Sequence, residues 1–141
     1  KLENILIDFS HELELYLIDF DFACTNNNSK QFNGGTLCYA APELLDINVK
    51  INNYNCVDIW ALGIVLYILL FNVLPWQVAN TKECIYFKEY TINSKYIYNM
   101  LSTLNIPIKY KIMYNKILNY CFDINYNERV NVSHILDLLE S

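Results

Sequence analysis

The chain has 141 residues, of which 54% are hydrophobic and 18% are charged, so its length and composition fit one domain with a sizeable core. This composition excludes a disordered tail, which needs low hydrophobicity together with high net charge. The formal net charge of -5 also lacks the positive excess of a nucleic-acid binder or of a polybasic membrane anchor.

The first predicted element is a small β-hairpin over residues 5–18. Residues 12–19 alternate between polar and apolar side chains, the pattern of a strand with one buried face. Residues 24–35 are polar and are expected to form a loop. A short helix is expected over residues 42–46, because proline is favoured in the first helical turn.

The central predicted element is a core helix over residues 58–71. Its apolar run of thirteen residues, 59–71, is too short for a membrane span, which needs roughly 18 residues or more. Asn72 is expected to end the helix. Gly63 lies inside it, where glycine costs roughly 1 kcal/mol relative to alanine. Close packing against a neighbouring segment is the expected reason for this glycine.

Three further helices are predicted in the second half of the chain, over residues 81–90, 110–122 and 132–139. Asn131 is placed to cap the last of them, since asparagine is among the preferred N-cap residues. The elements together predict a mainly α fold with one hairpin at its N-terminal end.

The five cysteines are widely spaced, odd in number and without a C-x-x-C pair, which disfavours a disulfide framework or a zinc knuckle. Reduced thiols and a cytoplasmic location are expected, with the nucleus as the alternative. No apolar leader is seen at Lys1, so no signal peptide is expected.

Several motifs occur in one order along the chain. They are Lys1-Leu2-Glu3-Asn4, Asp19-Phe20-Asp21, the stretch G-T-L-C-Y-A-A-P-E from Gly35 to Glu43, Asp58-Ile59-Trp60-Ala61-Leu62-Gly63, and Arg129. This ordered set resembles the C-terminal lobe of a eukaryotic protein kinase, from the end of the catalytic loop onward.

The resemblance covers essentially the whole chain and implies its architecture. Residues 1–141 are interpreted as part of a protein kinase domain, without the N-lobe and without the catalytic Asp. The implied fold is a kinase-like C-lobe, a helical bundle around the central apolar helix 58–71 with a short β-hairpin at the N-terminal end.

The resemblance assigns cofactors and catalytic roles to four residues. Asn4 and Asp19 match the amide and carboxylate ligands of Mg²⁺ that help to position ATP. Lys1 matches the lysine that lies against the γ-phosphate, and Thr36 matches the hydroxyl that bonds this lysine. Read alone, Asn4 is equally a turn residue, Asp19 a strand-end residue and Lys1 a solvated terminus.

The resemblance gives four other residues structural roles. Arg129 is the only arginine in the sequence, and its planar fork of donors indicates a bidentate partner. The implied partner is Glu43, in a buried ion pair, whereas the alternative is a surface arginine. Asp58 is expected to accept backbone N–H groups of the catalytic loop, and Trp60 to pack under the helix that begins at Pro42.

The chain departs from the family pattern at three places, one of which is Asn125-Tyr126 in place of the usual Asp-Pro before Arg129. Asp21 replaces the glycine of D-F-G, which restricts the backbone and adds a negative charge near the metal. The usual phosphorylation site lies three residues before Gly35, where Phe32 has no hydroxyl. Ser29 and Thr25 are the nearby substitutes.

The leading function is therefore ATP-dependent phosphoryl transfer by the full-length protein to serine or threonine of protein substrates. The stretch from Gly35 to Glu43 is similar to the branch of calmodulin-dependent and sucrose-nonfermenting kinases. The 141-residue chain alone is expected to be inactive. The alternative, based mainly on Asp21, is a pseudokinase or interaction module without catalysis. An unrelated helical domain is a third interpretation. No nucleic-acid partner and no membrane span is expected.

Overall fold

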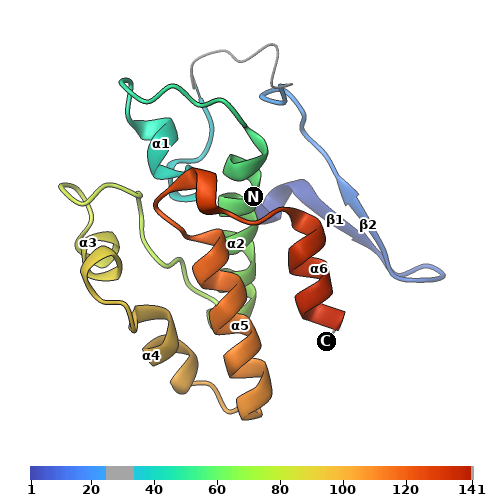
Figure 1. The fold of residues 1–141 in the computed structure, drawn as a ribbon. Coiled ribbons are helices and arrows are strands. Elements are labelled where there is room, and N and C mark those ends of the chain that lie inside the picture. The colour runs from blue at the N-terminus through green and yellow to red at the C-terminus, as the bar shows by residue number, and fades with distance from the viewer. Residues whose placement is uncertain (25–33, 141) are drawn as a thin grey trace.

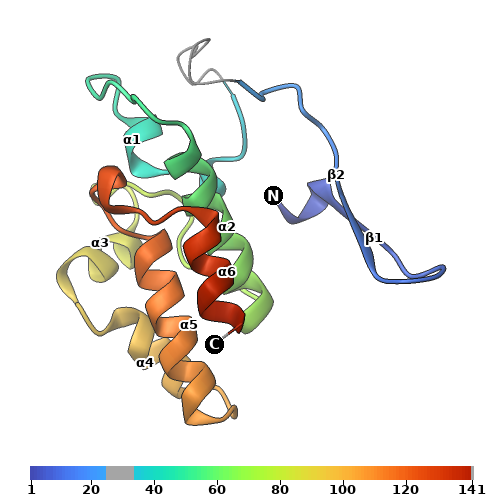
Figure 2. The ribbon, with the colours of Figure 1, turned by 45° about the vertical axis from the view of Figure 1, so that its right-hand side comes forward.

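The computed structural model describes residues 1–24 and 34–140. A two-stranded antiparallel hairpin projects from a body of helices (Figures 1 and 2). Strand β1 (Ile5–Asp8) pairs with strand β2 (Glu14–Leu17), with Ile5 opposite Leu17 and Asp8 opposite Glu14. The predicted mainly α fold with an N-terminal hairpin is confirmed.

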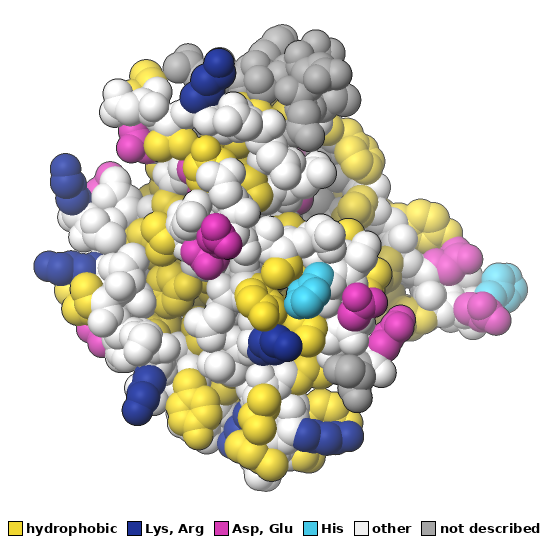
Figure 3. Space-filling model, in the orientation of Figure 1, with side chains coloured by type: hydrophobic (Ala, Val, Ile, Leu, Met, Phe, Trp, Pro, Cys, Tyr) yellow, Lys and Arg dark blue, Asp and Glu magenta, His cyan; other side chains and the backbone are white. Residues whose placement is uncertain are grey.

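The hairpin buries less than the sequence pattern predicted. Asp8 Oδ1 accepts the Ser10 N–H at 2.8 Å and fixes the turn. Yet all of β2 is exposed, and the apolar residues Leu15 and Leu17 of its expected buried face are 64% and 65% exposed. The expectation of a buried face is wrong for the described residues, because no other element among them packs over the hairpin. Figure 3 shows it standing away from the body, with acidic and histidine side chains near its tip.

One short helical turn precedes the hairpin, and two short helical segments lie between the hairpin and the central helix. They are η1 (Leu2–Asn4), η2 (Leu37–Tyr39) and α1 (Pro42–Leu45). The Tyr39 hydroxyl accepts the Leu2 N–H at 3.3 Å and so links the first turn to the second. The predicted short helix after Pro42 is confirmed.

Helix α2 (Asn55–Phe71) forms the centre of the body and begins three residues before the predicted start. Its first N–H, that of Asn55, is accepted by Asn53 Oδ1 at 3.0 Å. At the other end Asn72 has φ 55°, and its N–H reaches Ile68 O at 2.7 Å. Asparagine tolerates this left-handed conformation, so Asn72 ends the helix as predicted.

Four helices and a short 3₁₀ turn follow α2. They are α3 (Ile85–Ile92), α4 (Tyr96–Ser102), α5 (Ile108–Cys121), η3 (Tyr126–Glu128) and α6 (Val132–Glu140). Helix α3 begins four residues later than predicted, α4 was not predicted, and α5 begins two residues earlier. Asn131 Oδ1 accepts the His134 N–H at 2.9 Å, which confirms the predicted cap of α6.

Aromatic rings fill the core between α2, α3 and α5. Trp60 and Trp76 are fully buried, with ring centroids 5.4 Å apart, and Phe122 lies 5.2 Å from Trp60 and 4.9 Å from Trp76. Phe87 adds an edge-on contact to Trp76 at 5.1 Å. Such tilted and edge-to-face contacts add to the burial of each ring. None of the described helices is long and apolar enough to cross a membrane.

Gly63 allows α2 and α5 to approach closely. A Cβ at this position would lie 2.6 Å from Cys121 Cβ and 2.7 Å from Phe122 Cε1. Real Cβ atoms do not come this close to a buried neighbour, so a larger residue would push the two helices apart. The close packing predicted for Gly63 is confirmed.

Candidate functional site

Strand pairing brings together two residues that are 15 positions apart in the sequence. Asn4 directly precedes β1, and Asp19 follows two residues after β2. The ladder continues past the strands, because the Ile18 N–H is donated to Asn4 O at 3.0 Å. The Asn4 side-chain amide then donates to Asp19 Oδ2 at 3.3 Å.

The backbone at Asp19 adopts a left-handed conformation, with φ 63°. Aspartate enters this region more readily than most residues with a Cβ, although at some cost. Asp21 does not share it, since Asp19 and Asn72 are the only non-glycine residues with positive φ in the described part of the chain. The replacement of glycine by Asp21 therefore causes no left-handed strain in this conformation.

Lys1 completes this cluster. Its Nζ lies 3.9 Å from Asp19 Oδ2, and the two side chains are 34% and 41% exposed. Water screens such a pair, so its contribution to stability is small. The arrangement places a cation, a carboxylate and an amide around one point at the open end of the hairpin.

The donor chemistry of this cluster fits Mg²⁺ bound together with phosphates. The amide oxygen of Asn4 and one carboxylate oxygen of Asp19 receive no hydrogen bond from the described residues. Mg²⁺ prefers oxygen ligands and is commonly held by one or two carboxylates, waters and substrate phosphates. The described residues contain no group of three or more His, Cys, Asp or Glu side chains that could hold a metal alone.

No hydrogen bond joins Thr36 to Lys1 within the described ranges. Thr36 is exposed, and its carbonyl accepts the Tyr39 N–H at 2.9 Å. Tyr39 is the residue that contacts the N-terminal turn, through Leu2. Burial raises the pKa of Tyr39, so its hydroxyl stays protonated. Sequence reasoning missed Tyr39, because nothing in the motif distinguished it from a core aromatic residue.

Arg129 and Glu43 form a buried, two-point ion pair. Arg129 Nη2 donates to Glu43 Oε2 at 2.8 Å, and Nη1 donates to the other carboxylate oxygen. Nη1 also donates to Cys56 O at 3.0 Å, and Nε donates to Asp123 O at 2.9 Å. The pair predicted from the resemblance is confirmed, and it joins α1, the start of α2 and the segment before α6.

Trp60 lies directly beneath this ion pair. The Arg129 guanidinium carbon is 4.7 Å from the centre of a Trp60 ring. Trp60 is fully buried and belongs to the same core cluster as Ala41, the residue before α1. A cation over a desolvated indole is an attractive contact, so the ion pair and the core stabilise each other.

Asp58 has no hydrogen-bond donor among the described residues. Partial desolvation by the neighbouring residues raises the pKa of its carboxyl, because no donor offsets this effect, although Asp58 is itself an exposed residue. The resemblance places residues 1–4 at the end of the catalytic loop, and in the described part of the chain none of them donates to Asp58. Its role as an acceptor for that loop stays a prediction. Thr25, Ser29 and Phe32, considered for loop phosphorylation, lie outside the described residues.

Comparison with known proteins gives the family. Residues 1–138 match the model of the protein kinase domain, and the chain belongs to this family. It is 31% identical over 140 residues, 97% of its length, to "Calcium-dependent protein kinase 5" of Plasmodium berghei, and covers 23% of that protein. It is 40% identical over 81 residues to "Serine/threonine-protein kinase ppk16" of Schizosaccharomyces pombe, which is 55% of this chain and 12% of the yeast protein.

In a third relative, too, the matched region is a small part of the whole protein. The chain is 39% identical over 80 residues to "Serine/threonine-protein kinase KIN4" of Saccharomyces cerevisiae, 55% of this chain and 10% of that protein. The chain thus spans less than a quarter of the length of these three relatives. What the whole protein does is accordingly a matter of proposal.

Proposed function

We propose that the full-length protein transfers the γ-phosphoryl group of ATP to serine or threonine hydroxyls of other proteins, with Mg²⁺ as cofactor. The observation that carries this proposal is the meeting of Asn4, Asp19 and Lys1 at the open end of the hairpin, at 3.3 and 3.9 Å. Their types and order are those that the kinase motifs require, within a chain that belongs to the family.

Each of the three residues has a distinct role in this proposal. Asn4 would offer its amide oxygen and Asp19 its carboxylate to the metal. Bound Mg²⁺ would neutralise charge that develops on the phosphates. Lys1 would hold the phosphate to be transferred, since its ammonium is a compact cation with three donors. Asp19 Oδ2 already faces both the Asn4 amide and the Lys1 ammonium.

The specificity for serine and threonine rests on the relatives. Two of the matched proteins carry "Serine/threonine-protein kinase" in their names, and a third is named a calcium-dependent protein kinase. A cytoplasmic location is proposed on the five free cysteines. The chain contains no residue that the resemblance assigns as catalytic base, so activity is proposed only for the full-length protein.

The test is transfer of radioactive phosphate from γ-labelled ATP to a mixture of peptides, followed by phosphoamino-acid analysis. The full-length protein should label serine or threonine, and only with Mg²⁺ present. Asp19→Asn should lower the initial rate by about 100-fold or more, the loss typical of removing a transition-state charge stabiliser. Asp137→Asn, on the exposed side of α6, is the matched control and should leave the rate unchanged.

Two results would reject this proposal. One is a folded full-length protein that labels no peptide with Mg·ATP. The other is labelling that Asp19→Asn and Asp137→Asn reduce equally.

A further inference from the structure

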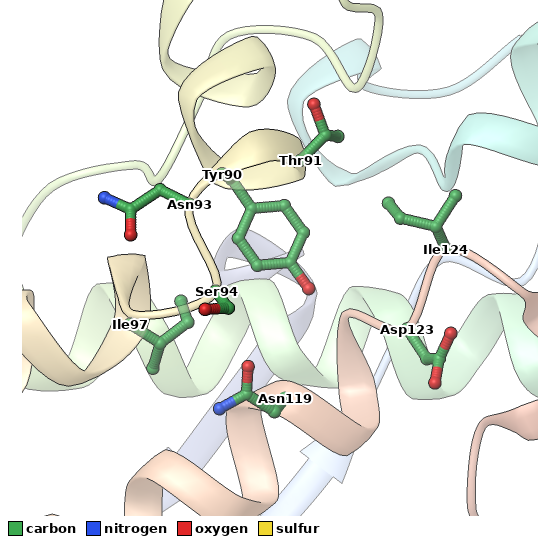
Figure 4. Close-up of a pocket in the computed structure, with 8 residues that line it drawn as sticks. All are labelled: Tyr90, Thr91, Asn93, Ser94, Ile97, Asn119, Asp123 and Ile124. Atoms are coloured by element: carbon green, nitrogen blue, oxygen red, sulfur yellow. The ribbon is translucent and has the colours of Figure 1, made fainter.

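A hollow of about 320 Å³ opens between α3, the start of α4 and the end of α5 (Figure 4). Its lining comes from α3, the connection to α4, α4 itself, α5 and the segment after α5. None of these elements contributes a residue to the cluster of Asn4, Asp19 and Lys1. Any ligand bound there is thus separate from the proposed phosphoryl transfer.

Two of its lining residues, Tyr90 and Asn119, already use their side-chain donors in hydrogen bonds within the protein. The Tyr90 hydroxyl donates to Phe122 O at 2.6 Å. Burial and the nearby charge of Asp123 raise the pKa of Tyr90, so it keeps this proton. The Asn119 amide nitrogen donates to Asn115 O at 2.6 Å and reaches Asn115 Oδ1 at 3.2 Å.

The donors at the rim are used in the same way. The Thr91 hydroxyl donates to Lys88 O at 2.7 Å. The Asn93 amide nitrogen donates to Glu89 Oε1 at 3.2 Å, and its oxygen accepts the Lys95 N–H at 3.0 Å. The hydroxyl of Ser94 makes no hydrogen bond with the described residues. Apart from it, the side chains of the hollow have few donors to offer to an acceptor such as a phosphate or a carboxylate.

Acceptors, in contrast, remain available. Asp123 Oδ1 accepts the Asn125 N–H at 2.9 Å, whereas Oδ2 receives no donor from the described residues. Asn119 Oδ1 also accepts no hydrogen bond from the described residues, and Figure 4 shows it pointing toward Ser94. The lone pairs of the Tyr90 oxygen add a third acceptor. Buried or half-buried acceptors without donors favour a ligand that brings donors of its own.

The charge of the hollow favours a cation. Asp123 is the charged residue of the lining, and it forms no ion pair within the described ranges. The charge of its neighbour Arg129 is already neutralised by Glu43, and Arg129 Nε donates a hydrogen bond to the backbone carbonyl of Asp123 and not to its carboxylate. Lys88 and Lys95, on the adjoining elements, are exposed and make no ion pair with Asp123.

Apolar surface accompanies these acceptors. Ile97 is 1% exposed and forms part of the wall, and Ile124 is 47% exposed at the side of the hollow. Ile92, next to the lining residue Thr91, is 72% exposed. A long side chain with an apolar stem and a cationic, donor-rich head would complement this combination. The exposed isoleucines would contact apolar residues on either side of it.

We propose that this hollow binds an arginine side chain of a protein partner. A guanidinium has five donors in a fixed plane, which can serve acceptors on several sides at once, whereas an ammonium has three on one atom. The carboxylate of Asp123 would supply the charge, Asn119 and Tyr90 the further acceptors, and Ile97 and Ile124 the contacts to the stem.

The test is a titration of the full-length protein, labelled at its isoleucine methyl groups, by NMR. The probes are the peptide acetyl-Ile-Arg-Ile-amide and its counterpart with neutral citrulline in place of arginine. The arginine peptide should shift the methyl signals of Ile97 and Ile124 saturably. It should bind about tenfold more tightly than the citrulline peptide, the effect of one hydrogen bond to a charged group.

The variant Asp123→Asn should remove most of this preference. Asparagine can still accept the Asn125 N–H, so the turn is retained. Asp46→Asn is the matched control, because Asp46 Oδ1 accepts the Asn48 N–H at the same 2.9 Å and Asp46 does not line the hollow. Equal binding of the two peptides, or an equal preference for arginine in the two variants, would overturn the proposal. So would tighter binding of a third peptide that has lysine in place of arginine. These measurements need no ATP, so they do not depend on the proposed function.

Discussion

Arg129 and Glu43 are 86 residues apart in the sequence, and their side chains meet with only 7% and 5% of each residue exposed. Every nitrogen of the guanidinium donates to the protein, to the carboxylate and to the carbonyls of Cys56 and Asp123. A buried charge that makes four hydrogen bonds ties three separate segments to one position. The first prediction follows from this arrangement.

Arg129→Ala should lower the free energy of unfolding by about 3–5 kcal/mol, because it leaves the Glu43 carboxylate buried without a partner. The measurement is urea unfolding followed by tryptophan fluorescence. Lys116→Ala removes an exposed cation from α5 and should change the midpoint little. The double variant Glu43→Gln/Arg129→Met should be more stable than Arg129→Ala, and the reverse order would contradict the pairing.

Gly63→Ala should destabilise the protein by about 1–3 kcal/mol, despite the better helix propensity of alanine, because overpacking strains a close helix contact. The added methyl group would overlap with Cys121 Cβ and the Phe122 ring. Leu62→Ala, at a 39% exposed position of the same helix, is the comparison and should cost less. A midpoint for Gly63→Ala equal to or above that of the parent would show that α2 and α5 separate without cost.

Asn131→Ala should lower the stability by about 1 kcal/mol, since the N-cap acceptor for the His134 N–H is lost. Asn131→Ser keeps an acceptor at this position and should restore most of the difference. Thermal unfolding measured by circular dichroism would detect both changes. If serine and alanine gave the same midpoint, the capping contribution would be absent.

Asp58→Asn should stabilise the protein at pH 7. Partial desolvation raises the pKa of Asp58 above its ordinary value of 3.8, so the folded state favours the protonated form and loses stability as the pH rises through the raised pKa. The gain from asparagine should therefore disappear at about pH 2.5, where the acid is almost fully protonated in both states. The gain is measured as the difference between the urea midpoints of Asp58→Asn and the parent protein at each of the two pH values. An equal gain at both would mean that ionisation is not its cause.

Asp21→Gly in the full-length protein should raise the initial rate of phosphoryl transfer at saturating Mg·ATP. The backbone of Asp21 is not left-handed, so the gain should come from removing a negative charge close to Asp19. Asp21→Asn should raise the initial rate in the same way, by roughly fivefold. This corresponds to the loss of about 1 kcal/mol of repulsion between two solvated charges. A rise with glycine alone would assign the effect to backbone freedom, and no rise with either would show that Asp21 is compatible with catalysis.

The sequence predicted those parts of the fold that local signals determine. Alternation predicted the hairpin, an apolar run predicted α2, and Asn131 predicted the start of α6. The start of α3 was misplaced, because Asn80 accepts the Lys82 N–H and holds the following residues in turns. Helix α4 has seven residues and no side-chain cap, so it depends on packing that a sequence pattern does not display.

The site was predicted to a similar extent. Motif order indicated that Arg129 would pair with Glu43, and the structure contains that pair. The same reasoning placed Asn4 near Asp19 but put Thr36 near Lys1, where no bond is found in the described ranges. The acceptor-rich hollow beside Tyr90 had no signal in the sequence. It depends on which donors are already used, and this is decided by tertiary contacts.

The hairpin has a consequence for the timescale on which the site exists. Asn4 and Asp19 are held together by a four-residue ladder whose side chains are almost all exposed. Little buried area opposes separation of these strands, so their amide hydrogens should exchange with solvent through frequent local openings, far faster than those of α2. Each opening parts the two residues. A ligand that binds between the two residues would bind only the closed conformation. It would therefore raise the population of that conformation and slow the amide exchange of the strands.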